Sequence, residues 1–157
     1  MATSIQETLD QLSHQLKSHS ETAWLDAQVL VAHHLGVPRT WLLTHPETDL
    51  NDHQYKAIQQ SVALLEAGVP LPYVIGHWEF YGLDFQLTPD VLIPRPETEL
   101  LVERAIRWLQ QHPHMRKVVD VGTGCGCIGI AIAKHIPDVQ MLLTDSSAKA
   151  LEVARKM

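Results

Sequence analysis

Glycine occupies every second position from 122 to 126, in the segment Asp120–Gly126, directly between a strand-like and a helix-like stretch. Around this segment the hydrophobic pattern alternates between strand and helix over residues 117–121, 128–136, 139–144 and 148–157. Two strands joined through a helix pair in the same direction, so the pattern predicts a βαβ unit with a parallel sheet.

The glycines indicate a turn that approaches a ligand closely. The chain must bend sharply at the carboxyl end of the strand, and a Cβ there would keep a ligand away from the backbone. The N-terminus of the following helix suits the carboxylate of an amino-acid-bearing ligand. Asp145, at the end of the next strand, is placed to accept hydrogen bonds from the ribose of an adenosine. A purely structural alternative is that the glycines serve helix–strand packing and that Asp145 caps the helix beginning near Ser147.

The same segment fits a second class of site. Gly124, Gly126 and Gly129 match the G-x-G-x-x-G fingerprint of dinucleotide-binding proteins, so an NAD(P)-dependent oxidoreductase is a competing hypothesis. With Asp120 ahead of the glycines, the motif reads Asp-x-Gly-x-Gly-x-Gly, which resembles that of methyltransferases that use S-adenosyl-L-methionine (SAM).

Residues 1–74 are predicted to form a helical bundle. Ser4–Glu7 has the capping-box pattern of a helix start, a second helix over 22–35 ends at Gly36, and Asn51 is placed to cap another. The apolar positions at helical spacing are Ile5, Leu9, Leu12 and Leu16, then Trp24, Ala27, Val31 and Leu35, then Trp41, Leu42 and Leu43, then Tyr55, Ile58, Val62 and Leu65.

Residues 75–96 are predicted to form a β-hairpin and an extended linker. Two aromatic-rich stretches, 77–81 and 84–88, flank Gly82, as in a hairpin. The prolines on both sides of Arg95 hold the following connection extended.

Residues 97–157 are predicted to be the truncated start of a Rossmann-like domain. It opens with a helix that begins near Thr98 and carries on its apolar face Leu101, Ala105, Ile106 and Leu109. The complete prediction is an α + α/β chain, with the helical bundle first, the hairpin linker second and the parallel sheet last.

Composition limits the class of protein. Hydrophobic residues make up 45% and charged residues 19% of the chain, as in a globular protein. The net charge of −6 argues against direct nucleic-acid binding. Cys125 and Cys127 are too close in sequence for a sound disulfide, which favours a reducing, cytoplasmic location. No secretory signal opens the chain, and the longest apolar run, 125–133, is too short to cross a membrane.

The histidines and tryptophans do not predict a site of their own. His33 and His34 point to different faces of a helix, and neither this pair nor His112 and His114 joins a cysteine or carboxylate at metal-ligand spacing. We therefore predict no metal. Core or interdomain positions are expected for the four tryptophans, Trp24, Trp41, Trp78 and Trp108.

The segment Leu92–Glu99, together with Asp120–Gly126 and Asp145, resembles the release-factor glutamine methyltransferase family. The resemblance covers essentially the whole chain, and Pro94–Glu99 is its most specific part. Members transfer a methyl group from SAM to the side-chain amide of the glutamine in the Gly-Gly-Gln motif of peptide chain release factors. The resemblance thus implies SAM as the cofactor and release factors as protein partners, and we expect a monomer.

The resemblance also implies which residues hold SAM. By position, the methionine part would be lined by Gly122, Thr123, Gly124, Cys125 and Gly126, the ribose would be held by Asp145, and the pocket would be bordered by Thr98 and more loosely by Arg95 and Glu97. Cys125 stands where serine or threonine is more usual, which leaves the backbone contacts intact.

One part of the family pattern is absent. An Asn-Pro-Pro-Tyr signature grips the substrate amide in this family, and no asparagine follows Asn51 here. The sequence therefore offers no catalytic residue, and we expect the chain to be inactive alone. The alternative from another class is a non-catalytic helical binding module with a vestigial nucleotide half-site.

Overall fold

The computed structural model describes residues 3–157. It divides into two compact units, the first ending at Ile75 and the second comprising Gly76–Met157. The hairpin predicted as a linker belongs to the second unit.

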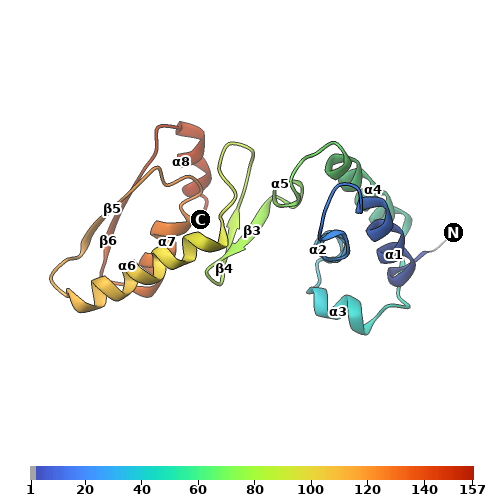
Figure 1. Ribbon diagram of the computed structural model, residues 1–157, viewed down its shortest axis with the longest axis horizontal. Coiled ribbons are helices and arrows are strands. Elements are labelled where there is room, and N and C mark those ends of the chain that lie inside the picture. The colour runs from blue at the N-terminus through green and yellow to red at the C-terminus, as the bar shows by residue number, and fades with distance from the viewer. Residues whose placement is uncertain (1–2) are drawn as a thin grey trace. The chain divides into compact units, whose positions relative to one another are not determined.

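The first unit is helical (Figure 1). Its helices are α1 (Ile5–Leu16), α2 (Ala23–Leu35), α3 (Arg39–Thr44), α4 (Asp52–Glu66) and α5 (Leu71–Ile75). Two short strands that the sequence did not predict, β1 (Thr3–Ser4) and β2 (Asp49–Leu50), pair antiparallel. This pairing ties the start of α1 to the segment that leads into α4.

The helix ends follow the predicted capping chemistry. Ser4 Oγ accepts a hydrogen bond from the Glu7 amide (3.2 Å), and Glu7 Oε2 accepts one from the Ser4 amide (3.0 Å). Asn51 and Gln54 form the same reciprocal pair at α4. Gly36 ends α2 in the left-handed conformation, with φ +67°. These local bonds satisfy backbone groups that a helix end otherwise leaves unpaired.

The core of the first unit forms around α2. Ala27, Leu30 and Val31 are fully buried there, as are most of the apolar residues predicted on α1 and α4. Trp24 departs from the prediction, because 43% of its surface is exposed. The buried stripe of α2 begins at Ala23 instead, so Trp24 lies one position off the stripe.

A polar pair links two helices of this unit. His34 Nε2 and Ser61 Oγ lie 2.8 Å apart, joining α2 to α4. Burial, with a smaller effect of the neighbouring His33, lowers the pKa of His34. His34 therefore has a structural role between the two helices.

The second unit contains the predicted hairpin and βαβ pattern (Figure 1). Its elements are β3 (His77–Phe80), β4 (Leu83–Gln86), the short 3₁₀ helix η1 (Pro96–Thr98), α6 (Glu99–Gln111), β5 (Lys117–Val121), α7 (Cys127–His135), β6 (Gln140–Thr144) and α8 (Ala148–Ala154). Strands β3 and β4 pair antiparallel, and β5 and β6 pair parallel. Both pairings were predicted from the sequence.

The hairpin is fastened to the rest of its unit at the turn. Tyr81 and Gly82 both have positive φ, +54° and +71°, which matches the twist of a two-residue hairpin turn. The Tyr81 amide donates to Glu99 Oε1 on α6 (2.8 Å), and the Tyr81 ring meets His135 of α7 edge-on. These contacts hold Tyr81 in a backbone conformation that residues other than glycine rarely adopt.

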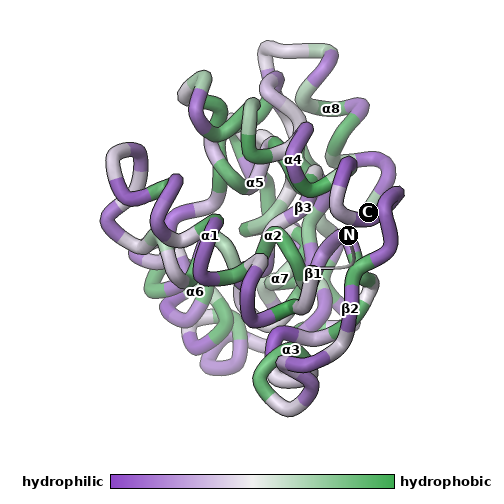
Figure 2. Tube along the Cα trace, turned by 90° about the vertical axis from the view of Figure 1, so that its right-hand side faces the viewer, coloured by the Kyte–Doolittle hydropathy of each residue, from purple (hydrophilic) through white to green (hydrophobic). Residues whose placement is uncertain are grey.

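Helix α6 buries Ile106 and Leu109 as predicted, but not Leu101. Its buried residues are Val102, Ile106 and Leu109, whereas Leu101 is 54% exposed. Positions 102, 106 and 109 follow the helical period, and Leu101 lies one residue to the side of this stripe. Trp108, expected in the core, is also exposed and stacks on His112. Figure 2 shows the resulting alternation of hydrophobic and hydrophilic residues along α1 and α6.

The two faces of the β5–β6 sheet differ. On one face Leu143 meets α7 at Gly129, where an added Cβ would collide with the leucine side chain. On the other face Val119, Val121 and Leu142 are exposed by 55%, 81% and 58%. Only one face of this sheet is therefore packed within the second unit.

Candidate functional site

The site begins at the glycine loop between β5 and α7. Gly122, Gly124 and Gly126 have φ of +77°, +56° and +86°, the left-handed region in which a side chain is strained. A Cβ built on Gly122 or Gly124 would meet no atom within 4 Å. The backbone at these two positions thus borders open space, as a loop that receives a ligand requires.

Gly126 and Gly129 are needed for packing instead. A Cβ on Gly126 would lie 2.7 Å from Ile130 Cδ1 and 3.3 Å from Ala154 Cβ. Gly129 lies against Leu143, as described above. Packing therefore accounts for these two glycines, whereas Gly122 and Gly124 have the required positive φ but no packing contact at the Cβ position.

Asp120 clamps the loop to the helix that follows. Its Oδ2 accepts hydrogen bonds from Thr123 Oγ1 (2.7 Å) and from the Gly129 amide (3.2 Å). From the sequence, Asp120 was predicted only as part of the motif, and this clamping role was missed. The signal was present, because an acid before a glycine loop with a threonine three residues later can close such a bond.

The end of β6 holds the other side of the loop. The Thr144 carbonyl accepts from the amides of Gly122 (2.8 Å) and Thr123 (2.9 Å). The Thr144 hydroxyl in turn donates to the Asp120 carbonyl (3.2 Å). The carboxyl ends of both parallel strands thereby converge on one loop.

Asp145 is joined to the glycine loop directly. Its Oδ2 accepts from the Gly124 amide and its Oδ1 from the Ser147 amide, each at 2.9 Å. These two bonds, Ser147 first, lower the pKa of Asp145 below its usual value. Helix α8 is capped by Ser147 Oγ, which accepts from the Ala150 amide. Each carboxylate oxygen of Asp145 has a second lone pair, with which it can accept a bond from a ligand hydroxyl.

The side chains of the loop point inward. Thr123 and Cys125 are 5% and 1% exposed, so a ligand would meet the backbone of these residues. Cys125 and Cys127 are free thiols. The hydrogen bond between the two thiols lowers the pKa of Cys125 to about 7 and, together with burial, raises the pKa of Cys127.

The remaining candidate residues lie at the start of α6. Thr98 is half-buried and ends η1, with its amide bonded to the Arg95 carbonyl (2.9 Å). Arg95 and Glu97 are exposed. The hydrogen bonds described above bring Asp120, the glycine loop and Asp145 together, and they do not include Thr98.

Neither a metal-binding cluster nor a membrane-spanning helix occurs among the described residues. Between residues 3 and 157, no three or more histidine, cysteine, aspartate or glutamate side chains gather closely enough to hold a metal ion. No helix in the same range has the length and apolar character needed to span a membrane.

Comparison with known families divides the chain at similar places. The PrmC N-terminal domain matches residues 7–76, and the methyltransferase small domain matches residues 97–157. The second match contains the whole glycine loop and Asp145.

Curated relatives share one name. The release factor glutamine methyltransferase of Bordetella pertussis is 46% identical over 130 residues, which cover 83% of this chain and 48% of the relative. That of Coxiella burnetii is 40% identical over 151 residues, covering 96% and 54%. That of Koribacter versatilis is 37% identical, covering 92% and 51%. The chain spans about half the length of these relatives, and it belongs to the release factor glutamine methyltransferase family.

Proposed function

We propose that this chain supplies the SAM-binding loop of a methyltransferase that modifies the glutamine of the Gly-Gly-Gln motif in peptide chain release factors. The observation that carries the proposal is the bonded pair of Asp145 and the Gly124 amide. It joins the two halves of an adenosine and amino-acid site at the carboxyl end of a parallel sheet, where ligands bind in such folds. The names of the relatives supply the substrate class.

The residues present fit SAM in three respects. Open space next to Gly122 and Gly124 leaves room for the methionine part against the backbone. Helix α7 begins directly after the loop, so the positive end of its dipole suits the methionine carboxylate. Asp145 would accept hydrogen bonds from the ribose, and Thr98 would border the pocket. When bound, SAM supplies an activated methyl group on a sulfonium centre.

We further propose that β5, α7 and β6 are the start of a Rossmann-like methyltransferase domain. Helices cover both faces of a doubly wound parallel sheet. The uncovered face here carries the apolar residues Val119, Val121 and Leu142, which further helices of such a domain would cover. Residues 97–157 would then carry the cofactor loop, and residues 1–74 would serve recognition of the protein substrate.

The acceptor site is proposed to lie outside these residues. An amide nitrogen is a weak nucleophile and must be oriented, and polarised through its N–H groups, before it can attack. The family's asparagine for this task has no counterpart after Asn51. The chain alone would therefore bind the cofactor without transferring its methyl group.

Calorimetric titration tests cofactor binding. We expect SAM to bind and NAD to show no affinity. Asp145→Ala should weaken SAM binding at least about tenfold, because a charged acceptor is lost. Asp138→Ala is the matched control, since Asp138 is an exposed carboxylate in the same unit, engaged by Arg116, and should leave SAM affinity unchanged. NAD binding without SAM binding would overturn the proposal.

Radiolabelled methyl transfer tests the acceptor site. A purified bacterial release factor should receive no label from this chain. A chimera that continues after Met157 with the corresponding remainder of the Coxiella burnetii relative should label it. Transfer by the chain alone would show that the acceptor site lies within residues 1–157.

A further inference from the structure

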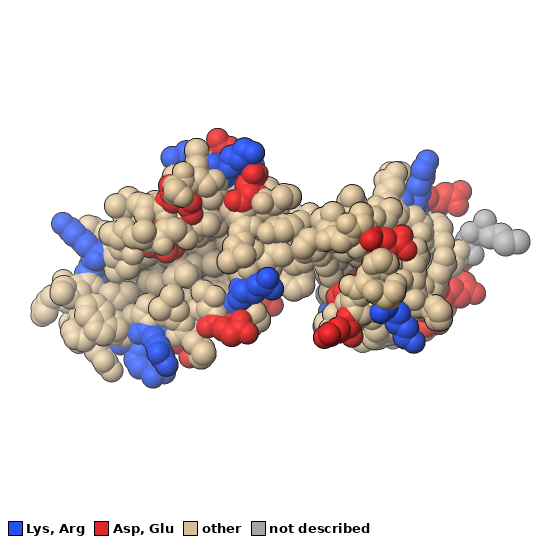
Figure 3. Space-filling model, turned by 45° about the horizontal axis from the view of Figure 1, so that its top comes forward, with Lys and Arg blue, Asp and Glu red and all other residues tan. Residues whose placement is uncertain are grey.

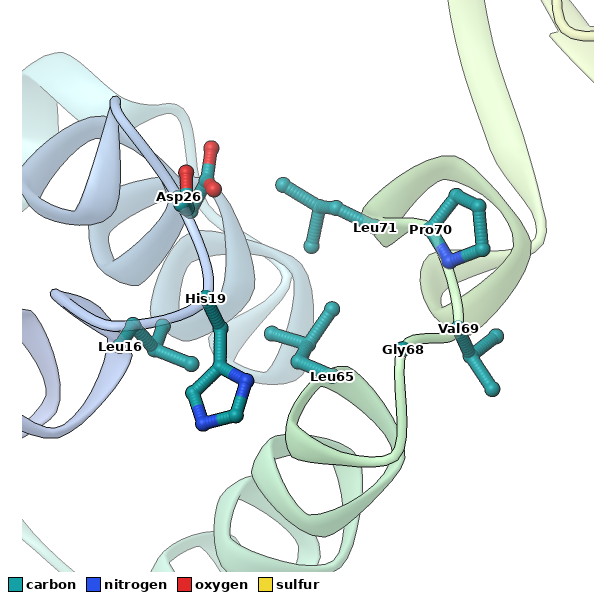
Figure 4. Close-up of a pocket in the computed structure, with 9 residues that line it drawn as sticks. Leu16, His19, Asp26, Leu65, Gly68, Val69, Pro70 and Leu71 are labelled. Carbon is teal, nitrogen blue, oxygen red and sulfur yellow. The ribbon is translucent and has the colours of Figure 1, made fainter.

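The first unit contains a small hollow of about 230 Å³ that the proposed methyltransferase site does not use. Figure 4 shows Leu16, Leu65 and Leu71 extending toward one another, with Asp26 on one side and His19 on another. Pockets for drug-sized ligands have about 300–1,000 Å³. This hollow is smaller, with room for one long side chain.

Asp26 is the anionic group of the hollow. It is half-buried in the first turn of α2, and its Oδ1 accepts a hydrogen bond from Thr22 Oγ1 (3.2 Å). Within residues 3–157 no hydrogen bond reaches its Oδ2. Apolar walls with one carboxylate beside them match the aliphatic stem and cationic head of lysine or arginine.

A second hollow of about 400 Å³ shares Ser20 with the first. It is lined by Trp24 and Leu25, whose surfaces are 43% and 42% exposed. An exposed tryptophan beside a recess is typical of protein–protein contact sites. The two hollows together place a recess with a carboxylate next to one that combines Trp24 and Leu25 with polar residues, among them Lys17 and Glu21.

The charge of the first unit points to the same kind of partner. Up to Ile75 the sequence has eight carboxylates against three lysines and arginines, whereas from Gly76 onward it has ten against nine. Nearly all the net negative charge of the chain thus belongs to the first unit. Red carboxylates are spread over this unit in the right-hand part of Figure 3. Such a surface attracts a basic partner and repels nucleic acid.

We infer that the hollow at Asp26 binds a lysine or arginine side chain from a basic segment of a partner protein, with an adjoining apolar residue seated on Trp24 and Leu25. The inference does not depend on the proposed SAM site, because all its residues lie in the first unit.

Nuclear magnetic resonance titration of this chain with two capped dipeptides tests the inference. The probes are acetyl-Arg-Leu-amide and acetyl-Gln-Leu-amide, which differ in the charge of the first side chain. We expect the arginine probe to shift amide signals in residues 19–26 and 68–71 and to bind about tenfold more tightly, the gain from one charge-assisted hydrogen bond. Its affinity should fall as salt rises.

Two variants and a control separate the parts of the surface. Asp26→Asn keeps an oxygen for Thr22 and should weaken the arginine probe about tenfold, leaving the glutamine probe unchanged. Trp24→Ala should weaken both probes. Glu47→Gln is the control, because it also replaces a carboxylate by an amide. Glu47 follows Pro46, whose carbonyl accepts from the Gln6 amide at the start of α1, whereas the hollow lies at the end of α1. This variant should change neither affinity. Circular dichroism checks that each variant is folded.

Several results would overturn the inference. They are equal affinities for the two probes, shifts confined to other residues, no shift at a probe concentration of about 10 mM, or an undiminished affinity for the arginine probe in Asp26→Asn. SAM titration of the unaltered chain, run beside the two probes, keeps the two proposals apart. If the unaltered chain binds SAM and neither probe, the cation site is rejected and the methyltransferase proposal stands.

Discussion

The two units of this chain complete their cores to different degrees. In the first unit, Leu30 and Val31 of α2 are fully buried among neighbouring helices, as are Leu12 of α1 and Ile58 of α4. In the second, α7 packs on one face of the β5–β6 sheet while the other face exposes Val121 by 81%. A helix needs partners along one stripe, whereas a parallel sheet needs cover on both faces. Short helices can therefore close a core within 75 residues, and two parallel strands cannot.

Hydrogen exchange should show the largest difference between the units. We expect amides in residues 5–67 to exchange at least about 1,000-fold more slowly, relative to free peptide, than amides from residue 115 onward. This ratio corresponds to about 4 kcal/mol of opening free energy. The reason is that β5 and β6 each pair on one edge only and carry one uncovered face. Exchange measured by mass spectrometry tests this, and equal protection in both units would contradict it.

A cavity in the first unit should have the next largest effect. Leu30→Ala removes a fully buried side chain and should lower the free energy of unfolding of this unit by about 3 kcal/mol. Leu43→Ala makes the same chemical change at a residue that is 59% exposed, and should stay within about 0.5 kcal/mol. Urea unfolding followed by circular dichroism measures both. If the two variants lost equal stability, the closed core assigned to the first unit would be wrong.

Alanine variants of two loop glycines should lose different amounts of stability, because one glycine is needed for packing and the other borders open space. Gly126→Ala should destabilise the second unit by about 2 kcal/mol, because the new Cβ meets Ile130 and the backbone has positive φ. Gly122→Ala has positive φ but open space around the Cβ, so it should lose only about 1 kcal/mol. Urea unfolding gives the order, and a greater loss for Gly122→Ala would refute the assignment of Gly126 to packing.

Acid should loosen the loop through Asp145, with the smallest effect of the four. The folded pKa of Asp145 lies below its ordinary value of 3.8 because the Ser147 and Gly124 amides bond to the carboxylate. Its contribution to stability is therefore complete above about pH 4 and is lost as the pH falls through the lowered pKa. Exchange at the Gly124 and Ser147 amides, corrected for its intrinsic pH dependence, should accelerate in that range.

Two variants identify the group responsible for this acid response. Asp145→Asn should abolish the response at Gly124. Asp138→Asn should preserve it, although the hydrogen bond from Arg116 lowers the pKa of Asp138 as well. If Asp138→Asn also lost the response, the acid effect could not be attributed to Asp145.

Local sequence signals predicted most elements of both units. The caps at Ser4 and Asn51 and the turn at Gly82 act through neighbours within three residues, so each is visible in a short window of sequence. The β1–β2 pairing was missed because each strand has only two residues and its partner lies far along the chain. The first position of the buried face of α6 was misplaced by one residue, since Leu101 and Val102 are both apolar and only their tertiary neighbours distinguish them.

The sequence by itself determined the order of the longer elements, the parallel βαβ pattern and the family, because these depend on residue type at fixed spacing. Only the tertiary structure showed which glycines of the loop border open space and which are needed for packing. Gly122 and Gly124 border open space, whereas Gly126 faces Ile130 and Ala154. It also showed that Asp145 bonds to the Gly124 amide, 21 residues earlier in the chain. A linear pattern places a glycine and an acid in their elements, but only the packed fold brings the carboxylate to the amide.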